Sequence, residues 1–380
     1  VGKAAVPMAS ALATDLRGMA PGSLVTAVGA TCCDPLPPPV RLLDGDHPLP
    51  ADASARAASA ALEALARAEP STPVLLALSG GASAAWCAPA ADLSVADIAT
   101  ATSVLMRHGA SIQQLNCVRR HLSAIQGGWL AVRAAPRPLL TLALVDVVGG
   151  EPHDIGSGPA VGDPTRHADA LAAIDALGAG RELPPPIRRH LELGAAGRRP
   201  ENPAPDDPIL GTVGFFEIGT PALLLDAMLA VAADLDLALE VERALVSCSV
   251  ESLADRLAAW VRAAPAGKRL ALAGETTLTL PARPGRGGRA HHLVLAVAAR
   301  LHDAARPWAL CAVGSDGSDG NSGAAGAAVD REALAHLDRA ELEHALTNAD
   351  SATLLARLGA QIVTGPTGTN LTDVIAIDVG

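Results

Sequence analysis

The chain of 380 residues is poor in aromatic side chains: it has no tyrosine, two phenylalanines and four tryptophans. Its cores must therefore be built from alanine, leucine and valine. The hydrophobic fraction of 49% is that of a globular protein and excludes a disordered one. No apolar run reaches the ~18 residues that span a bilayer, and no signal peptide is recognisable. We expect a cytoplasmic protein with no membrane partner, and because Val1 is not Met, we expect residues before it in the native chain.

The chain also lacks an excess of positive charge and any cysteine framework. Its net charge of -11 argues against a general affinity for nucleic acid, although a local basic pocket remains compatible with it. We expect a small-molecule substrate and a monomer or homodimer. The six cysteines have no Cys-x-x-Cys spacing and no pairing pattern, so we interpret them as reduced core residues. They are Cys32, Cys33, Cys87, Cys117, Cys248 and Cys311.

Both common nucleotide-binding signatures are absent from the loop at residues 79–83. This loop reads Ser-Gly-Gly-Ala-Ser, which contains neither the Gly-Lys-Ser/Thr of a Walker A motif nor a Gly-x-Gly-x-x-Gly. It nevertheless follows an apolar strand, and a small-residue turn at a helix start offers free backbone N–H groups to an anion. Its candidate binding residues are Ser79, Gly80, Gly81 and Ser83. An ordinary tight turn is the alternative.

Strands and helices alternate along the first half of the chain. Continuous apolar runs at 74–78 and 139–148 predict strands buried on both faces of a parallel sheet. Such an α/β fold places ligands at the carboxyl ends of its strands. We further predict a strand at 24–30 and helices at 4–19, 51–68, 95–108 and 113–124.

A proline-rich segment separates the two expected domains. Residues 200–208 contain four prolines in nine positions, which predicts a linker. We assign residues 1–210 to a larger N-terminal domain and 211–380 to connecting helices and a smaller α/β domain. The segment 211–266 is expected to be mostly helical, and 270–380 to form the compact unit.

Two glycine-rich loops of opposite charge follow predicted strands in the second half. A strand at 270–280 leads to Gly-Arg-Gly-Gly-Arg at 285–289, whose guanidiniums match carboxylate or phosphate. A helix at 292–301 and a strand at 308–313 lead to the second loop, where Asp316 and Asp319 suggest a hard cation. Arginines and a cation together are what phosphoryl transfer requires. Ordinary surface turns are the alternative.

Further polar residues lie on a helix and on two loops. The helix at 113–124 carries Asn116, Arg119 and Arg120 on neighbouring turns, and a solvated arginine face is the alternative interpretation. His47 precedes a proline in a loop. Thr367 and Asn370 belong to a small-residue loop at 364–370, which follows a strand-like run at 360–363.

Nine motifs in this order resemble one family, the type II glycerate 2-kinases, whose C-terminal module is called MOFRL. The resemblance covers nearly the whole chain. The motifs are Gly-Lys-Ala-Ala at 2–5, His-Pro-Leu-Pro at 47–50, Leu-Ser-Gly-Gly at 78–81, Val-Arg-Arg-His-Leu-Ser at 118–123, Ser-Gly-Pro at 157–159, Gly-Glu-Thr-Thr at 274–277, Gly-Arg-Gly-Gly-Arg at 285–289, Asp-Gly-Ser-Asp-Gly at 316–320 and Thr-Gly-Pro-Thr-Gly-Thr-Asn at 364–370.

The resemblance implies phosphorylation of D-glycerate to 2-phosphoglycerate with ATP and Mg²⁺. It implies a Rossmann-like N-terminal domain, a smaller C-terminal α/β domain and an active site in the cleft between them, with Lys3 and Arg289 as catalytic residues. Asp316 and Asp319 would hold the metal. Phosphate or nucleotide would be bound by Ser79, Gly80, Gly81, Ser83, Gly287, Gly288, Thr367 and Asn370, and the substrate by His47, Asn116, Arg119, Arg120 and Arg286.

The sequence departs from the family pattern near the proposed site. Ala290-His291-His292 stands where the family usually has Asn-Gln-Glu. Other departures are Ala82 for a glycine, Gln126 for a lysine, Val145 for a serine and Gly323 for an aspartate. Two other functions therefore remain as alternatives: a hydroxypyruvate reductase that uses NAD(P)H, and a non-catalytic protein that binds a sugar acid or nucleotide.

Overall fold

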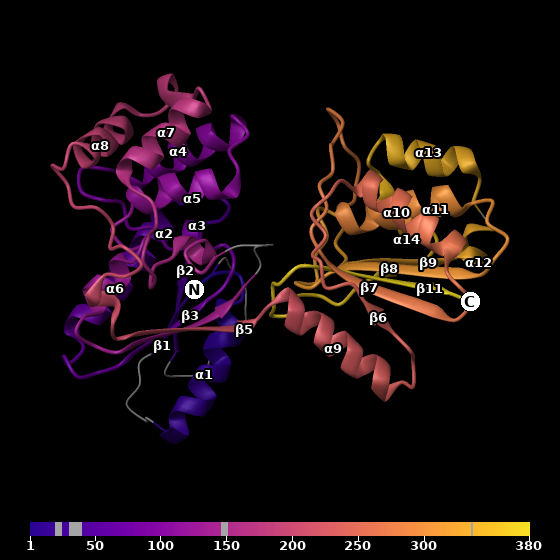
Figure 1. Ribbon diagram of the computed structural model, residues 1–380, viewed down its shortest axis with the longest axis horizontal. Coiled ribbons are helices and arrows are strands. Elements are labelled where there is room, and N and C mark those ends of the chain that lie inside the picture. The colour runs from indigo at the N-terminus through magenta and orange to yellow at the C-terminus, as the bar shows by residue number, and fades with distance from the viewer. Residues whose placement is uncertain (20–24, 30–39, 146–150, 336) are drawn as a thin grey trace. The chain divides into compact units, whose positions relative to one another are not determined.

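The computed structural model describes residues 1–19, 25–29, 40–145, 151–335 and 337–380. The chain divides into two compact units, Val1–Ile218 and Gly219–Gly380. Both units combine helices with strands (Figure 1), which confirms the α/β class predicted from the sequence. Among the residues that the structure describes, no helix is long and apolar enough to cross a membrane.

Parallel strand pairs form the sheets of the first unit. β1 (Val25–Gly29) pairs with β2 (Val40–Asp44), and β3 (Val74–Leu78) pairs with β4 (Leu139–Leu144), beyond which lies β5 (Val213–Gly219). β3 and β4 are the two apolar runs predicted as buried strands. The end of the second predicted run, 146–148, lies outside the described residues. Because β3 and β4 are parallel, their carboxyl ends meet at one edge of the sheet.

Two helices of the first unit, α4 and α5, begin at a serine that satisfies free backbone N–H groups. Ser94 and Ser111 each form a capping box, in which the serine hydroxyl accepts from the third helical residue and that residue's side chain accepts in return. α4, α5, α7 and α8 share one hydrophobic core and gather together in Figure 1. The helices are α1 (Ala5–Met19), α2 (Asp52–Arg67), α3 (Ala82–Ala85), α4 (Val95–Arg107), α5 (Ile112–His121), α6 (Trp129–Ala134), α7 (His167–Ala176) and α8 (Pro185–Ala195), with 3₁₀ turns at Ile155–Ser157, Ala179–Arg181 and Pro208–Leu210.

The segment 200–208 is packed inside the first unit, so the linker prediction is wrong. Asn202 is buried: its amide donates to Asp163 at 2.8 Å, and its carbonyl accepts from the indole of Trp129 at 2.7 Å. The carbonyl of Pro203 also accepts from the backbone of Asp163. Asn202 and Pro203 are the buried residues that hold this segment against its neighbours, and local composition cannot distinguish such a segment from a linker.

A six-stranded sheet organises the second unit, in the order β10-β9-β8-β11-β7-β6. β11 lies antiparallel between β7 and β8, with Asp373 opposite both Gly274 and Gly314. The carboxyl ends of β7 and β8 therefore meet the start of β11 at one edge. The strands are β6 (Glu240–Val241), β7 (Lys268–Gly274), β8 (Trp308–Gly314), β9 (Gly326–Asp330), β10 (Gln361–Ile362) and β11 (Asp373–Val379).

Helices cover both faces of this sheet. α10, α11, α13 and α14 lie on one face and α9 on the other (Figure 1). Residues of α11 are buried nearly all round, which makes this helix the centre of the core. The helices are α9 (Pro221–Asp234), α10 (Val250–Ala263), α11 (Arg289–Leu301), α12 (Arg331–Leu334), α13 (Arg339–Thr347) and α14 (Ser351–Arg357).

Two predicted elements of the second half need correction. The strand expected at 270–280 ends at Gly274, whose φ of 142° takes the chain out of the strand; a Cβ there would lie 2.3 Å from the carbonyl oxygen of Val246. The segment 211–266 is also less helical than expected, because it contains β5 and β6.

The described cysteines are free thiols, as expected, but only part of them belong to the core. Cys87 and Cys117 are buried, whereas Cys248 and Cys311 are half-buried. Cys32 and Cys33 lie outside the described residues.

Candidate active site

The loop after β3 forms the first part of the candidate site. Ser79, Gly80 and Gly81 connect β3 to the short helix α3, and Gly81 adopts a φ of 81° that favours glycine. The chain at Lys3 and Ala4 runs beside this loop. The backbone N–H of Lys3 donates to the carbonyl of Gly80 at 2.8 Å, and that of Ala4 donates to the hydroxyl of Ser79 at 3.0 Å. These bonds hold Lys3 at the carboxyl end of β3.

Two cations and an imidazole gather at Gly81. A Cβ on this glycine would lie 3.0 Å from Cδ2 of His47 and 3.4 Å from Cγ of Lys3, so both side chains contact it closely. Partial burial lowers the pKa of His47, and the charges of Lys3 and Arg119 lower it further. Burial also lowers the pKa of Arg119, to about 10, which leaves it charged at neutral pH.

Among the described residues, the cations of this group have no acidic partner. Within the described part of the chain, neither Lys3 nor Arg119 has a carboxylate oxygen within ion-pair distance. Lys268, in contrast, forms an ion pair with Glu240 on the surface of the second unit. Among the described residues, Lys3 and Arg119 therefore present uncompensated positive charge near His47, which favours binding of an anion.

Arg120 is not placed to bind a substrate, which corrects the prediction for this residue. Its side chain is 2% exposed and forms ion pairs with Asp163 at 3.0 Å and Asp154 at 3.5 Å. Its guanidinium also donates to the carbonyl of His153 and the hydroxyl of Thr165. The two adjacent arginines on α5 thus differ in surroundings, because Arg120 is paired with acids in the core whereas the charge of Arg119 acts on His47.

The polar side chains beside this group form a closed network. The hydroxyl of Ser157 donates to the amide oxygen of Asn116 at 3.2 Å and lies 2.8 Å from the hydroxyl of Ser83. The amide nitrogen of Asn116 donates to the carbonyl of Asp154. Asn116 and Ser83 therefore stabilise the loops around the site, and their roles as ligands stay predictions.

Three loops meet at the strand ends of the second unit. The loop 285–289 lies against 314–320: a Cβ on Gly288 would lie 2.2 Å from Oδ1 of Asp319. The third loop, 364–370, is joined to the second by the backbone N–H of Thr367, which donates to the carbonyl of Asp316. The structure thus brings together the two loops of opposite charge that the sequence singled out.

Asp319 holds the start of α11. Its Oδ1 accepts from the backbone of Ala290 at 3.1 Å, and its Oδ2 accepts from the backbone of His291 at 2.8 Å. The imidazole Nδ1 of His291, which is fully buried, lies 2.6 Å from the same Oδ2. Protein donors therefore occupy both oxygens, and a metal role for Asp319 stays a prediction. The residues at 290–292 that depart from the family pattern are buried in α11 and pack in its core.

Arg289, the first residue of α11, bridges two carboxylates. Its guanidinium lies 2.9 Å from Glu275 and 3.4 Å from Asp373. Burial alone would lower the pKa of Arg289, but the hydrogen bond that its guanidinium donates to Glu275 and the charge of Asp373 raise it. Arg289 is therefore the positive centre of an acidic cluster.

Asp373 is the most perturbed acid of this cluster. Burial raises its pKa to about 7; Arg289 opposes that rise, and the charges of Glu275, Asp319 and Asp316 add to it. The sequence prediction missed Glu275 and Asp373. Glu275 lies in the Gly-Glu-Thr-Thr motif at 274–277 but was given no role there, and Asp373 belongs to no motif. The pairing of β7 with β11, which brings the two acids together, was not visible in the sequence.

Other predicted residues of the second unit lie on the same loops. Arg286 is exposed, and its guanidinium donates to the carbonyl of Ser322 at 2.9 Å. The N–H of Gly287 donates to the side chain of Asn321. Thr367 donates its hydroxyl to the carbonyl of Ser315, and Asn370 lies in the same 364–370 loop.

Two family profiles match the chain. Residues 1–192 match a "Domain of unknown function (DUF4147)", and residues 269–373 match the "MOFRL family".

Named relatives cover the chain almost completely. A protein of Agrobacterium vitis that is named a hydroxypyruvate reductase is 33% identical over 100% of this chain and 98% of its own length. A glycerate 2-kinase of Pyrococcus horikoshii is 30% identical over 99% of this chain and 85% of its own length.

The crystal structure of a glycerate kinase from Thermotoga maritima has the same fold. It superposes with a TM-score of 0.87 at 28% identity, covering 100% of this chain and 90% of that one. The two domains in this order, the full-length relatives and the shared fold agree with the resemblance found in the sequence. The chain belongs to the type II glycerate kinase family, in which a DUF4147 domain precedes a MOFRL domain.

Proposed function

We propose that this protein transfers the γ-phosphoryl group of ATP to the 2-hydroxyl of D-glycerate or a similar small hydroxy acid. Membership of the family supports a kinase, and relatives named glycerate 2-kinase support this acceptor. The product would be 2-phosphoglycerate. The parallel strand pairs of the first unit are compatible with a Rossmann-like domain.

The observation that carries the proposal is the positive group at Gly81. Substrate and nucleotide of a glycerate kinase are both anions, with a carboxylate on one and phosphates on the other. Lys3 and Arg119 have no carboxylate partner among the described residues, so binding an anion there breaks no ion pair. Neutral His47, whose pKa is lowered, adds a hydrogen-bonding group without further charge. We assign Lys3 to catalysis, and Arg119 and His47 to binding.

Arg289 is the catalytic arginine in this proposal. Stabilising charge on a migrating phosphoryl group is the main task of a kinase, and a guanidinium matches phosphoryl oxygens with two parallel donors. Glu275 and Asp373 fix the orientation of Arg289 from one side, which reduces the entropy lost when it binds a ligand.

Mg²⁺ fits the carboxylates around Arg289. Glu275, Asp319 and Asp316 each raise the pKa of Asp373, against the opposing charge of Arg289, so negative charge gathers at this carboxyl. Mg²⁺ prefers one or two carboxylates and keeps several waters. Asp316 and Asp373 would hold it, Asp319 through water. When bound, the metal would neutralise charge on the phosphates.

Hydroxypyruvate reductase is the second candidate, because relatives carry that name. Such an enzyme needs a nicotinamide cofactor, and the loop after β3 has no Gly-x-Gly-x-x-Gly. The positive group at Gly81 would bind phosphates and carboxylates in a kinase and in a reductase alike. An activity assay therefore has to distinguish the two reactions.

Coupled assays of ADP release with Mg·ATP and a panel of hydroxy acids test the proposal. We expect turnover with D-glycerate and no NADH oxidation with hydroxypyruvate. NADH oxidation without ADP release would establish the reductase instead. Binding of ATP and glycerate in calorimetry without any product would establish a non-catalytic protein.

Lys3 and Lys268 provide a matched pair of variants for the same assay. Lys3→Met should lower kcat by about 10³-fold, the scale on which a charge-stabilising group acts in phosphoryl transfer, and should leave the melting temperature nearly unchanged because Lys3 is exposed and unpaired. Lys268→Met should leave kcat unchanged. Equal kcat values for the two variants would remove Lys3 from the catalytic residues.

A further inference from the structure

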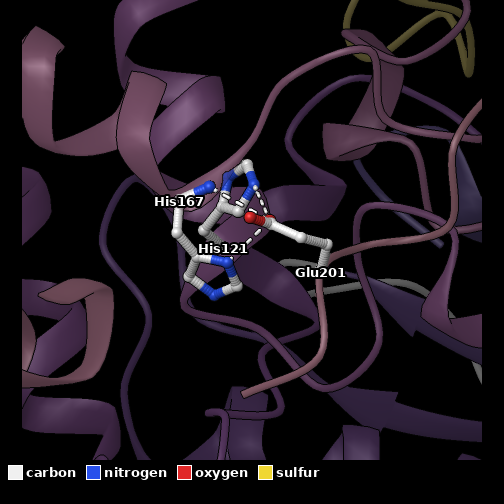
Figure 2. Close-up of side chains that lie close together, drawn as sticks. All are labelled: His121, His167 and Glu201. Atoms are coloured by element: carbon white, nitrogen blue, oxygen red, sulfur yellow. Dashed lines mark hydrogen bonds and ion pairs between the residues drawn. The ribbon is translucent and has the colours of Figure 1, made fainter. Parts of the chain in front are cut away.

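A second cluster of ligand-type side chains lies in the first unit, built from three separate parts of the chain. His121 ends α5, His167 begins α7, and Glu201 lies in the packed segment 200–208. Figure 2 shows the three side chains directed toward one another. Both imidazoles are buried and the carboxylate is half-exposed. None of the three belongs to the machinery assigned to phosphoryl transfer.

The geometry of the cluster fits a tetrahedral ion. Oε2 of Glu201 lies 2.7 Å from Nδ1 of His167 and 3.7 Å from Nε2 of His121, and all three ligand atoms lie within 4.8 Å of one another. Metal–ligand bonds of about 2.0–2.1 Å place tetrahedral ligands roughly 3.3 Å apart. Metal binding would replace the hydrogen bond between His167 and Glu201 and draw the other pairs, which lie within 4.8 Å, to that separation.

The hydrogen bonding of His121 leaves one of its ring nitrogens available to a metal. Its Nδ1 lies 2.9 Å from the carbonyl of Cys117, so this nitrogen carries the proton and donates it. The lone pair is thereby left on Nε2, which is buried and has no hydrogen-bond partner among the described residues, the oxygen of Glu201 lying 3.7 Å away. A buried polar atom without a partner is costly and calls for an explanation, and a bound cation supplies one.

Charged groups of both signs surround the two imidazoles. The acids that act on His121 are Glu201 and Asp163, of which Asp163 is already paired with Arg120. A cavity of about 200 Å³ adjoins both imidazoles, lined also by His190, Trp129 and Asn202, with room for a water as fourth ligand. Arg133 and Arg199 line the same cavity.

We propose that His121, His167 and Glu201 bind one Zn²⁺ ion, with water in the fourth position. Two imidazoles and one carboxylate are a known zinc ligand set, and imidazole disfavours Mg²⁺, which separates this site from the kinase metal. The ion would join α5, α7 and segment 200–208. Since α5 also carries Arg119, zinc would stabilise the helix that positions a substrate-binding residue.

Zinc titration of chelator-treated full-length protein tests this. We expect one Zn²⁺ per chain by elemental analysis, and a melting temperature that rises with zinc concentration, as it does for a ligand that binds only the folded state. Co²⁺ in place of zinc should show d–d absorption without a thiolate charge-transfer band, because the ligands are nitrogen and oxygen.

Variants then locate the ion. Glu201→Gln keeps the shape of the half-exposed side chain and an oxygen for the start of α7, and should weaken zinc binding by more than the ~10–100-fold that loss of an outer-shell partner costs. His121→Gln should do the same. The matched control is His108→Gln, which removes the histidine of a surface pair with Glu182 and should bind zinc normally.

Three results would overturn the proposal. The first is a wild-type protein that binds no zinc after chelator treatment. The second is wild-type zinc affinity in a folded Glu201→Gln variant, with folding checked by its melting curve without metal. The third is a thiolate band with Co²⁺, which would assign the ion to cysteines.

Discussion

Arg289 combines a fixed position with donors that a ligand can use. Its contacts with Glu275 and Asp373 use the planar guanidinium fork, which a lysine cannot reproduce. We therefore predict that both Arg289→Lys and Arg289→Ala lower kcat by on the order of 10³-fold, or roughly 4 kcal/mol in transition-state stabilisation. Steady-state kinetics with D-glycerate measure this loss.

Arg286 is the control for this prediction, because it lies three residues away on the same loop. Within the described part of the chain, its guanidinium hydrogen-bonds only to the backbone carbonyl of Ser322. Arg286→Ala should retain more activity than Arg289→Ala. A larger loss in Arg286→Ala, with near-normal turnover in Arg289→Ala, would exchange the roles of the two arginines.

Asp373 gives the protein a pH-dependent stability. Its pKa is raised from 3.8 to about 7 in the folded chain, so between these values the folded state holds a proton that the unfolded state has lost. The free energy of unfolding therefore falls as pH rises through this window. Asp373→Asn has no carboxyl at this position, so its free energy of unfolding does not fall for this reason.

Denaturant unfolding without Mg²⁺ measures the effect. Relative to wild type, Asp373→Asn should show little difference near pH 4 and an advantage on the order of a few kcal/mol by about pH 8. A difference that is independent of pH would show that the carboxyl titrates normally.

At the scale of elements, the start of α11 depends on a loop thirty residues further along the chain. The carboxylate of Asp319 occupies the space where a side chain on Gly288 would lie, 2.2 Å from the Cβ position. Gly288→Ala should therefore displace this cap, lower stability by about 1–3 kcal/mol and reduce kcat, because Arg289 is the next residue.

Gly359→Ala is the control for that change. Gly359 also lies in the second unit and has nothing within 4 Å of its Cβ position, but its φ is 67°. The variant should lose about 1 kcal/mol through backbone strain while kcat is unchanged. Melting curves and kcat for both variants separate a local clash from general strain.

Elements with strong local signals were predictable. The continuous apolar runs of β3 and β8 and the periodic helices α2 and α4 begin and end within two residues of their predicted limits. The second half of the strand predicted at 270–280 was wrong. Its alternating residues from 274 on do not form a strand, because Val246 approaches Gly274 closely. The predicted start of α11 at 292 was wrong for a related reason: the helix begins at Arg289, because Asp319 caps it from a distant loop.

At the scale of the whole molecule, each unit has hydrophobic cores of its own. One large cluster lies in the second unit, and two others lie in the first. The tryptophans divide equally, with Trp86 and Trp129 in the first unit and Trp260 and Trp308 in the second. Because there is no tyrosine, these four residues dominate the fluorescence.

We predict that denaturant unfolding is not a single two-state transition. Trp86→Phe/Trp129→Phe leaves reporters only in the second unit, and Trp260→Phe/Trp308→Phe leaves them only in the first. The two proteins should show different fluorescence midpoints. Coincident midpoints, also matched by circular dichroism, would mean that the units unfold together.

Sequence reasoning reached the active-site loops because each is a contiguous motif, such as Leu78 to Gly81. It could not separate Arg119 from Arg120, because the difference depends on Asp154 and Asp163, more than thirty residues away. No sequence motif indicates the cluster of His121, His167 and Glu201, because its members are also far apart in the chain. Charge partners across long separations are set by tertiary packing alone.

Lys3 and Lys268 are the only two lysines in the chain, and their surroundings differ: Lys3 is free of carboxylates in the described chain, whereas Lys268 is paired with Glu240. The protein is therefore suited to chemical labelling of amines. An acyl-phosphate derivative of ATP should acylate Lys3 rapidly and Lys268 slowly, and excess ATP should protect Lys3 alone. Peptide mass spectrometry reads both sites in one sample, and equal labelling would show that no nucleotide phosphate reaches Lys3.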